Sequence, residues 1–247
     1  MNIDHIRMSA YKLRLFGVHG SAQQVADLAV SKNLHPLEFL NLILHEEELF
    51  RKNRISKSLT TRAKFRVMAN FEDWDTSFDR GITKSKLKEL AGLSFLINKE
   101  SIIITGKTGE GKTQLSVAIG RRACAESLSV QFLSVNIFFE EVQREKIAGR
   151  YLKYLQLLSK IKILILDDFG LRNYTHEEAN VLMDVLEDRY QRSSIIVTSQ
   201  VDPKGWKRLF EDPVIAEAIV DRMANPSQIL TLKGGSYREK LGAKKTA

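Results

Sequence analysis

The first 75 residues carry apolar side chains at the three- and four-residue spacing of amphipathic helices, with few β-branched runs. Ser21 and Gln24 stand at capping-box spacing before an apolar run, which predicts a helix start there. Pro36 fits the first turn of a further helix that continues to about Arg54, and a short third helix is predicted over 61–70. We expect residues 1–75 to form a small, all-helical N-terminal domain.

From about residue 76 onward, short apolar runs alternate with amphipathic helical stretches. The predicted strands cover 101–105, 130–135, 161–166, 194–199 and 228–232. The predicted helices cover 84–96, 112–127, a stretch capped by Asn136, 150–159, a stretch to about 191 opened by a Thr175–Glu178 capping box, and 214–223. This alternation predicts an α/β domain over 76–247, with a central parallel five-stranded sheet covered on both faces and a short basic tail.

Composition excludes several classes of protein. The 247 residues are 43% apolar, which is enough for a substantial core without disulfides or bound metal. The single cysteine, Cys124, excludes a disulfide scaffold and a cysteine-rich zinc site and favours a reducing compartment. The sequence shows neither a signal-peptide core nor an apolar run of transmembrane length, so we expect a cytoplasmic protein with no membrane partner.

The charge balance indicates a polyanionic partner, most commonly a nucleic acid, because 38 Lys and Arg against 30 Asp and Glu give a net charge of +8. Seven basic residues without an acidic neighbour are candidate contacts to a DNA backbone: Arg51, Lys52, Arg54, Lys57, Arg62, Lys64 and Arg66. The same run also fits a solvated basic face balanced by the acidic residues 46–48. A second candidate group follows the second strand: Arg144, Lys146, Arg150 and Lys153. No base-reading motif is present, so we expect sequence-tolerant binding.

A glycine-rich loop between the first predicted strand and a helix matches G-x-x-x-x-G-K-[ST] in full: Gly106, Lys107, Thr108, Gly109, Glu110, Gly111, Lys112 and Thr113. Glycines let successive backbone N–H groups point at phosphate oxygens, and the following helix aims its positive end at the same place. Lys112 is then expected to reach the β- and γ-phosphates, and the Thr113 hydroxyl to ligate Mg²⁺. The loop therefore predicts binding of a nucleotide triphosphate with Mg²⁺.

Two strand ends supply candidate catalytic groups. An apolar strand ends in Asp167 and Asp168, which we expect to hold Mg²⁺ through water and to polarise the attacking water, respectively. The strand over 194–199 is expected beside it, so Ser199, with Thr198 and Gln200 close by, is a candidate contact to the γ-phosphate or the water. Simple polarity at a strand end is the alternative interpretation.

Arg222 follows late in an amphipathic helix, from which it does not obviously reach the phosphates of its own chain. It is a candidate arginine finger toward a neighbouring subunit, while a surface Asp–Arg pair is the alternative. A guanine-reading Asn-Lys-x-Asp element is not present, since its nearest match, 98–101, fails in residue type and position.

Taken together, these residues resemble the AAA+ ATPases of the IstB/DnaC-like group, and most closely the IstB-type helper ATPases of insertion-sequence transposition. The resemblance rests on residues 13–17, 37–40, 46–48 and the basic run that follows, on 114–120, and on 165–170, 197–200 and 218–223. It implies an AAA+ (ASCE) P-loop fold and an ATP-dependent homo-oligomer, a ring or spiral, that binds double-stranded DNA and assists a transposase. It also places Arg222 at the arginine-finger position.

The chain departs from the family pattern in two places, and one absence agrees with the subgroup. Lys107, Thr108 and Glu110 occupy variable positions of the phosphate loop, where change is tolerated. Asp168 stands where many AAA+ proteins have Glu, and its shorter side chain predicts slow hydrolysis. No helical lid is expected after the last strand, and Arg238 is the candidate for the ATP contact that such a lid supplies.

Three other functions stay open. A helicase loader of the DnaC kind would prefer single-stranded DNA, although the basic N-terminal stretch favours the transposition helper. A nucleotide-switched scaffold would bind ATP with little turnover. A small-molecule kinase would need an acceptor pocket and an arginine-rich lid, and neither is visible.

Overall fold

The computed structural model describes residues 2–225 and 227–235; Arg238 lies outside them. The chain divides into two compact units, one up to Ser58 together with Ala125–Ser127, the other Leu59–Cys124 together with the chain from Leu128 onward. The assignment of 1–75 to one functional domain stays a prediction. Within the described residues, no helix combines the length and the apolar character needed to cross a bilayer.

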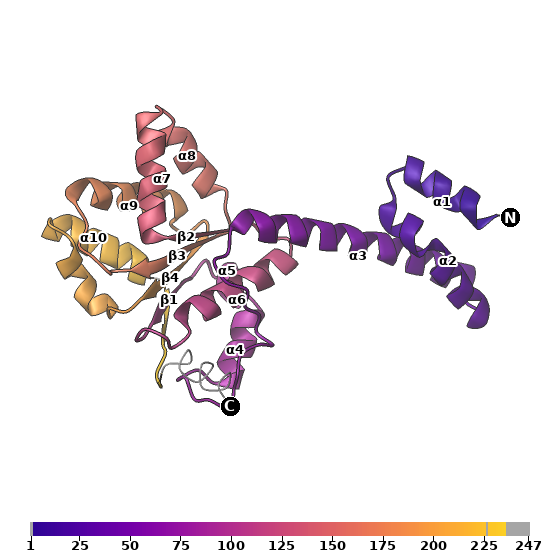
Figure 1. Cartoon of the computed structure of the whole chain (residues 1–247), viewed down its shortest axis with the longest axis horizontal. Helices are drawn as coiled ribbons and strands as arrows, with labels where there is room; N and C mark the ends of the chain where they lie inside the picture. The colour runs from indigo at the N-terminus through magenta and orange to yellow at the C-terminus, as the bar shows by residue number, and fades with distance from the viewer. Residues whose placement is uncertain (1, 226, 236–247) are drawn as a thin grey trace, which may run out of the picture. The chain divides into compact units, whose positions relative to one another are not determined.

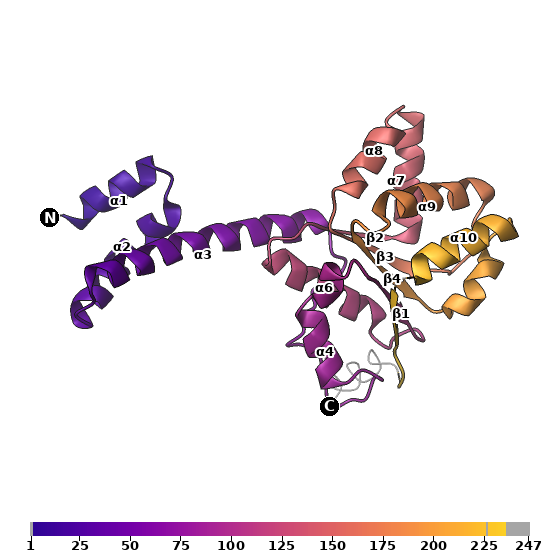
Figure 2. The same ribbon diagram turned by 180° about the vertical axis from the view of Figure 1, so that it is seen from behind.

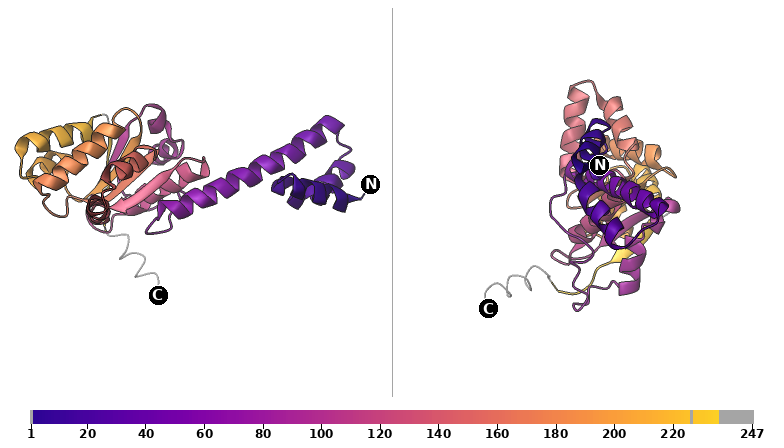
Figure 3. Two further views of the ribbon diagram at one scale, coloured as in Figure 1. Left: turned by 90° about the horizontal axis from the view of Figure 1, so that it is seen from above. Right: turned by 90° about the vertical axis from the view of Figure 1, so that its right-hand side faces the viewer.

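The N-terminal segment contains helices α1 (Ile3–Lys12), α2 (Phe16–Ser31) and α3 (Pro36–Ala63). α3 is one continuous helix (Figure 3), nine residues longer than the sequence predicted from its apolar spacing. Residues 61–63, the start of the third helix predicted over 61–70, are therefore the last residues of α3. The remainder of that prediction is wrong, because Lys64 turns into the left-handed region at φ 57° and the following residues are not helical.

The helix start predicted at Ser21 is also wrong. Ser21 lies inside α2, where its hydroxyl donates to the carbonyl of Gly17 at 2.9 Å. The amino end of α2 is satisfied from α3 instead, since Glu47 Oε2 accepts from Gly17 N at 2.7 Å and Val18 N at 3.2 Å. A cap supplied from 30 residues further along the chain leaves no local sequence signature.

The second unit is built on five parallel strands, β1 (Ser101–Thr105), β2 (Val130–Ser134), β3 (Ile163–Phe169), β4 (Ser194–Ser199) and β5 (Ser227–Thr231), in the order β2-β3-β4-β1-β5. The sheet predicted from the alternation of elements is thus confirmed. Its helices are α4 (Lys84–Ala91), α5 (Ser94–Ile97), α6 (Lys112–Ala125), α7 (Val135–Ile147), α8 (Tyr151–Ser159), α9 (His176–Arg189) and α10 (Pro213–Ala224), with a 3₁₀ segment η1 (Pro203–Leu209) that the sequence did not predict.

Helices cover both faces of the sheet (Figure 1, Figure 2). An apolar core lies beneath the helices on each face, because successive strand residues point to opposite sides. On β3, Ile163 and Ile165 join the core under α4, α5 and α6. Leu164 and Leu166 join the core under α7, α8, α9 and α10. All four side chains are fully buried, so β3 is central and its last residues emerge at the carboxyl edge of the sheet.

Local capping explains where prediction and structure agree or differ. The Thr175–Glu178 capping box at the start of α9 is confirmed. The cap predicted at Asn136 is wrong, because Ser134 accepts from Ile137 N and is the cap, so that α7 begins two residues earlier than predicted, at Val135. The single helix predicted over 84–96 is divided into α4 and α5 by Leu93, whose φ is 57°.

Candidate active site

The glycine-rich loop joins β1 to α6 and has the backbone conformation that its glycines permit. Gly106, Gly109 and Gly111 have φ angles of 151°, 88° and 100°, a region that other residues rarely adopt. A Cβ on Gly111 would lie 2.9 Å from Nη1 of the buried Arg80. The Arg80 side chain therefore packs against the loop at Gly111, and the backbone conformation of the loop depends on glycine at these positions.

Side chains within the loop hold it in a closed shape. The Lys112 ammonium donates to the carbonyls of Gly106 and Lys107, both at 2.8 Å, so the lysine lies across the loop. The Glu110 carboxylate accepts from Lys107 N at 2.6 Å and is buried. The contact of Lys112 with nucleotide phosphates stays a prediction.

Asp167 joins the loop to the central strands. Its carboxylate accepts from Thr113 Oγ1 at 3.0 Å and from Thr198 Oγ1 at 2.6 Å. Burial raises the pKa of Asp167, while the two threonine hydroxyls act in the opposite direction. A hydroxyl and a carboxylate side by side suit a hard divalent cation, so Thr113 and Asp167 are the residues that fit Mg²⁺.

Asp168 has an unusual backbone, with φ 63°, at an irregularity in the pairing of β3 with β4 between Leu166 and Phe169. Positive φ is uncommon for a residue other than glycine and is concentrated at functional sites. The irregularity lets both Asp167 and Asp168 reach the cavity described next, instead of pointing to opposite faces of the sheet. Asp168 N donates to Thr198 Oγ1 at 3.0 Å, which fixes this turn.

A cavity of about 420 Å³ lies over the loop and both aspartates. It is lined by Thr108, Gly109, Gly111, Lys112, Thr113, Gln114, Asp167, Asp168, Leu171 and Gln200, and by Arg66 and Val67. The P-loop residues and the two acids that the sequence singled out are thus brought together. The presence of Arg66 is new, because the sequence grouped this residue with candidate DNA contacts.

The polar end of β4 lies between the P-loop strand and the acidic strand, as expected. Ser199 is fully buried, and its hydroxyl donates to Phe169 O at 2.7 Å and accepts from Val201 N at 3.0 Å. The residues of this strand end that reach the site are Thr198, through Asp167, and Gln200, which accepts from Thr108 Oγ1 at 2.9 Å. The contact with the γ-phosphate or the water that the sequence predicts for Ser199 therefore fits Thr198 and Gln200 better.

Arg222 in α10 forms an ion pair with Glu187 of α9 at 3.2 Å. It lines a shallow depression together with Ser101 and Ser193, at the edge where the strands begin. The P-loop follows the opposite end of β1, and a five-residue strand spans about 16 Å. Arg222 therefore lies far from the phosphate site of its own chain, and its role toward a neighbouring subunit stays a prediction.

The basic positions of α3 differ in their surroundings. Arg51 donates to Glu47 at 2.7 Å, and Lys52 pairs with Glu126 at 2.8 Å. Arg54, Lys57 and Arg62 are exposed. Beyond the helix, Lys64 stands 3.7 Å from Glu141. Within this run Glu47 therefore balances the charge of Arg51, while Arg54, Lys57 and Arg62 expose their side chains to solvent.

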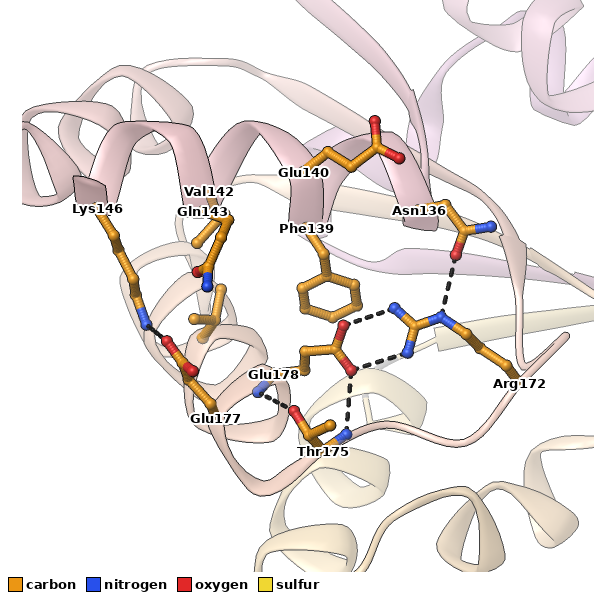
Figure 4. Close-up of a pocket in the computed structure, with 11 residues that line it drawn as sticks. Asn136, Phe139, Glu140, Val142, Gln143, Lys146, Arg172, Thr175, Glu177 and Glu178 are labelled. Atoms are coloured by element: carbon orange, nitrogen blue, oxygen red, sulfur yellow. Dashed lines mark hydrogen bonds and ion pairs between the residues drawn. The ribbon is translucent and has the colours of Figure 1, made fainter. Parts of the chain in front are cut away.

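The second basic group lies at α7 and α8, and three of its four members, Arg144, Lys146 and Arg150, are paired with acids. Arg150 donates to Glu145 at 2.8 Å, and Arg144 stands 3.9 Å from Glu145 and also from Glu141. Lys146 pairs with Glu177 at 2.9 Å on one side of a cavity of about 620 Å³ between α7 and the start of α9 (Figure 4). Lys153 is exposed.

Known proteins resemble this chain over most of its length. A family model described as "IstB-like ATP binding protein" matches residues 8–245. An ATP-binding protein of insertion sequence IS21 from Pseudomonas aeruginosa is 33% identical over 235 residues, which cover 95% of this chain and 88% of that protein.

Solved structures share the fold at low sequence identity. A crystal structure of DnaI matches with a TM-score of 0.57 at 20% identity, covering 72% of this chain and 94% of that chain. The AMPPCP-bound DnaA of Aquifex aeolicus matches with a TM-score of 0.58 at 18% identity, covering 74% of this chain and 55% of that chain. The second unit therefore shares its fold with these proteins.

Proposed function

The chain belongs to the IstB-like ATP-binding proteins and has the AAA+ fold, and from this premise we propose that it is a DNA-binding ATPase that assists a transposase. The observation that carries the ATPase part is the juxtaposition of Thr113 with Asp167, at 3.0 Å, beneath a cavity that Lys112 and Asp168 also line. In this proposal residues 76–247 form the ATPase domain and residues 1–75 serve DNA or a partner.

The reaction we propose is in-line attack of water on the γ-phosphate of ATP, which yields ADP and phosphate. Lys112 binds the phosphates, and Asp168 orients the water and accepts its proton. Thr113 and Asp167 hold Mg²⁺, which neutralises developing charge on the phosphates when it is bound. Thr198 positions Asp167, and Gln200 lies where it meets the γ-phosphate or the water.

Assembly completes the site in our proposal. Arg222 lies at the opposite edge of the sheet from its own P-loop, which supports a role in a head-to-tail contact with the next subunit. There it stabilises the charge of the transition state. ATP binding then drives formation of a ring or spiral, and hydrolysis reverses it.

Exposed basic residues support DNA as one partner, and similarity to an insertion-sequence protein supports a transposase as another. The exposed Arg54, Lys57 and Arg62 on α3 favour contact with phosphates of double-stranded DNA without base reading. The Pseudomonas aeruginosa relative carries an insertion-sequence name, which supports a transposase as the partner. We place this activity in the cytoplasm.

Sedimentation of the full chain with ATP and Mg²⁺, on matched double-stranded and single-stranded DNA, tests the proposal. We expect ATP-dependent oligomers on the duplex and none on the single strand. Assembly only on the single strand would point to a helicase-loader function instead. No assembly on either DNA, with ATP still bound, would leave a nucleotide-switched scaffold and remove the role of Arg222.

A further inference from the structure

Residues 64–70, which follow α3, form a segment fixed at both of its ends. Phe65 packs against Phe132 of β2 with ring centroids 6.3 Å apart, and its ring fills the space where a side chain on Gly120 would lie, 2.8 Å from that Cβ. At the other end, Asn70 Oδ1 accepts from Arg121 Nε at 2.9 Å. The backbone at Arg66 is thus held between two anchors on the ATPase unit.

This anchoring brings the Arg66 side chain to the nucleotide cavity. Its Nη1 stands 3.8 Å from Oδ2 of Asp168, and the residue lines the cavity together with Lys112 and Thr113. The Arg66 side chain is 68% exposed and that of Asp168 is 35% exposed. An ion pair this open to water is weak, so the guanidinium exchanges partners readily.

We propose that Arg66 senses the γ-phosphate of ATP within its own subunit; the inference rests on the proposed ATPase function and adds a residue to its site. Without nucleotide, or with ADP, Arg66 stays with the single negative charge of Asp168. When ATP is bound, the γ-phosphate offers more charge and a bidentate partner, and Arg66 moves to it. The ion pair between Arg66 and Asp168 is then broken.

The exchange gives the weak, solvent-exposed pair of Arg66 and Asp168 a role in nucleotide selection. Transfer of Arg66 occurs only when the bound nucleotide carries a γ-phosphate. The site therefore distinguishes the triphosphate from the diphosphate before the next subunit contributes anything.

Equilibrium binding of ATP and of ADP, each with Mg²⁺, to full-length Arg66→Ala tests the proposal. We expect ATP affinity to fall about tenfold, as for loss of a hydrogen bond to a charged group, with ADP affinity unchanged within about twofold. Arg66→Lys keeps the charge but not the fork and is expected to lose less. Arg62→Ala, an exposed arginine of α3, is the matched control and should bind both nucleotides like the wild type.

A second measurement uses Asp168→Ala, which frees Arg66 from its carboxylate. It should raise ATP affinity about threefold more in the wild-type background than in the Arg66→Ala background, since the two residues are coupled. Equal losses of ATP and ADP affinity in Arg66→Ala, or no loss of either, would overturn the proposal. Lys112→Ala in the same assay tests the proposed function separately from the role of Arg66. ATP binding that persists in Lys112→Ala would refute the phosphate-loop assignment.

Discussion

Gly111 of the phosphate loop and Gly149, which follows α7, both have positive φ angles but differ in what a side chain would contact. At Gly111 a Cβ would meet Arg80 Nη1 at 2.9 Å, whereas at Gly149, with φ 65°, it would meet nothing within 4 Å. We expect Gly111→Ala to lower the stability of the folded protein by about 2 kcal/mol and to abolish ATP binding.

Gly149→Ala is the control for this prediction, because it imposes the same kind of backbone strain without a clash. It should cost about 1 kcal/mol of stability and leave ATP affinity unchanged. Thermal unfolding and nucleotide titration of both variants give the two quantities. Wild-type ATP affinity in Gly111→Ala would mean that the loop tolerates a side chain there.

Glu47 supplies a pH-dependent contribution to the helical N-terminal unit. Burial by itself would raise its pKa, but the Arg51 guanidinium and the amides of Val18 and Gly17 hold the pKa of Glu47 below its usual value. Because the folded state favours the charged form, this stabilisation is present above the unfolded pKa of about 4.3 and is lost as the pH falls through the lower, folded value.

Glu47→Gln should therefore destabilise the start of α2 by about 1 to 2 kcal/mol at pH 7, with a difference that closes in acid. Hydrogen exchange of the Gly17 and Val18 amides reports on this helix start directly. Glu48→Gln, at an exposed neighbouring position, is the control and should leave both amides protected. A difference that stays constant from pH 7 to pH 3 would contradict the assigned cause.

At the scale of elements, the sequence predicts what is encoded locally. The bounds of β1 and β4 match the prediction because their β-branched runs end at glycine and at polar residues. The P-loop and Asp167 are also predicted from the sequence, because the residues with the chemical role lie within short local motifs.

Contacts between distant segments account for the differences. The cap that Glu47 gives to α2 and the place of Arg66 beside Asp168 both join residues far apart in the chain. Arg66 looked like one more member of a basic run, and nothing in its neighbours marked the turn at Lys64 that separates it from α3. Tertiary packing, which local patterns do not record, decides such cases.

The basic positions of α3 allow a sharper test of DNA binding than the run as a whole. Arg51 is engaged by Glu47, so its charge reversal would also disturb the cap of α2. Charge reversal of the exposed Arg54 and Arg62 to Glu should weaken duplex binding at least tenfold and reduce the dependence of log affinity on log salt by about two.

The control for this experiment is the same change of charge on another element. Lys204→Glu with Arg208→Glu alters two exposed residues of η1 and should leave both the affinity and the salt slope near their wild-type values. An unaltered slope in the α3 variant would move the DNA contacts to α7 and α8. An equal loss in both variants would show that only net charge matters.

At the scale of the assembled molecule, the role that we propose for Arg222 would divide each active site between two chains. Arg222→Ala should bind ATP like the wild type and lose DNA-stimulated turnover about a hundredfold or more, since an arginine finger acts on the transition state. Glu187→Gln removes the ion-pair partner of Arg222, seen at 3.2 Å, and should retain turnover. Full turnover in Arg222→Ala would assign the arginine to that surface pair alone.

Mixing two inactive variants tests whether the arginine acts between subunits. Arg222→Ala keeps an intact P-loop and Asp168, whereas Asp168→Asn keeps Arg222 but lacks the base. In a head-to-tail assembly of equal parts, about one interface in four joins an intact site to an intact arginine, so the mixture should recover about a quarter of wild-type turnover. Because neither variant supplies both groups itself, recovery requires contact between chains. A mixture as inactive as its components, although it sediments as an oligomer on DNA, would show that Arg222 does not complete a neighbouring site.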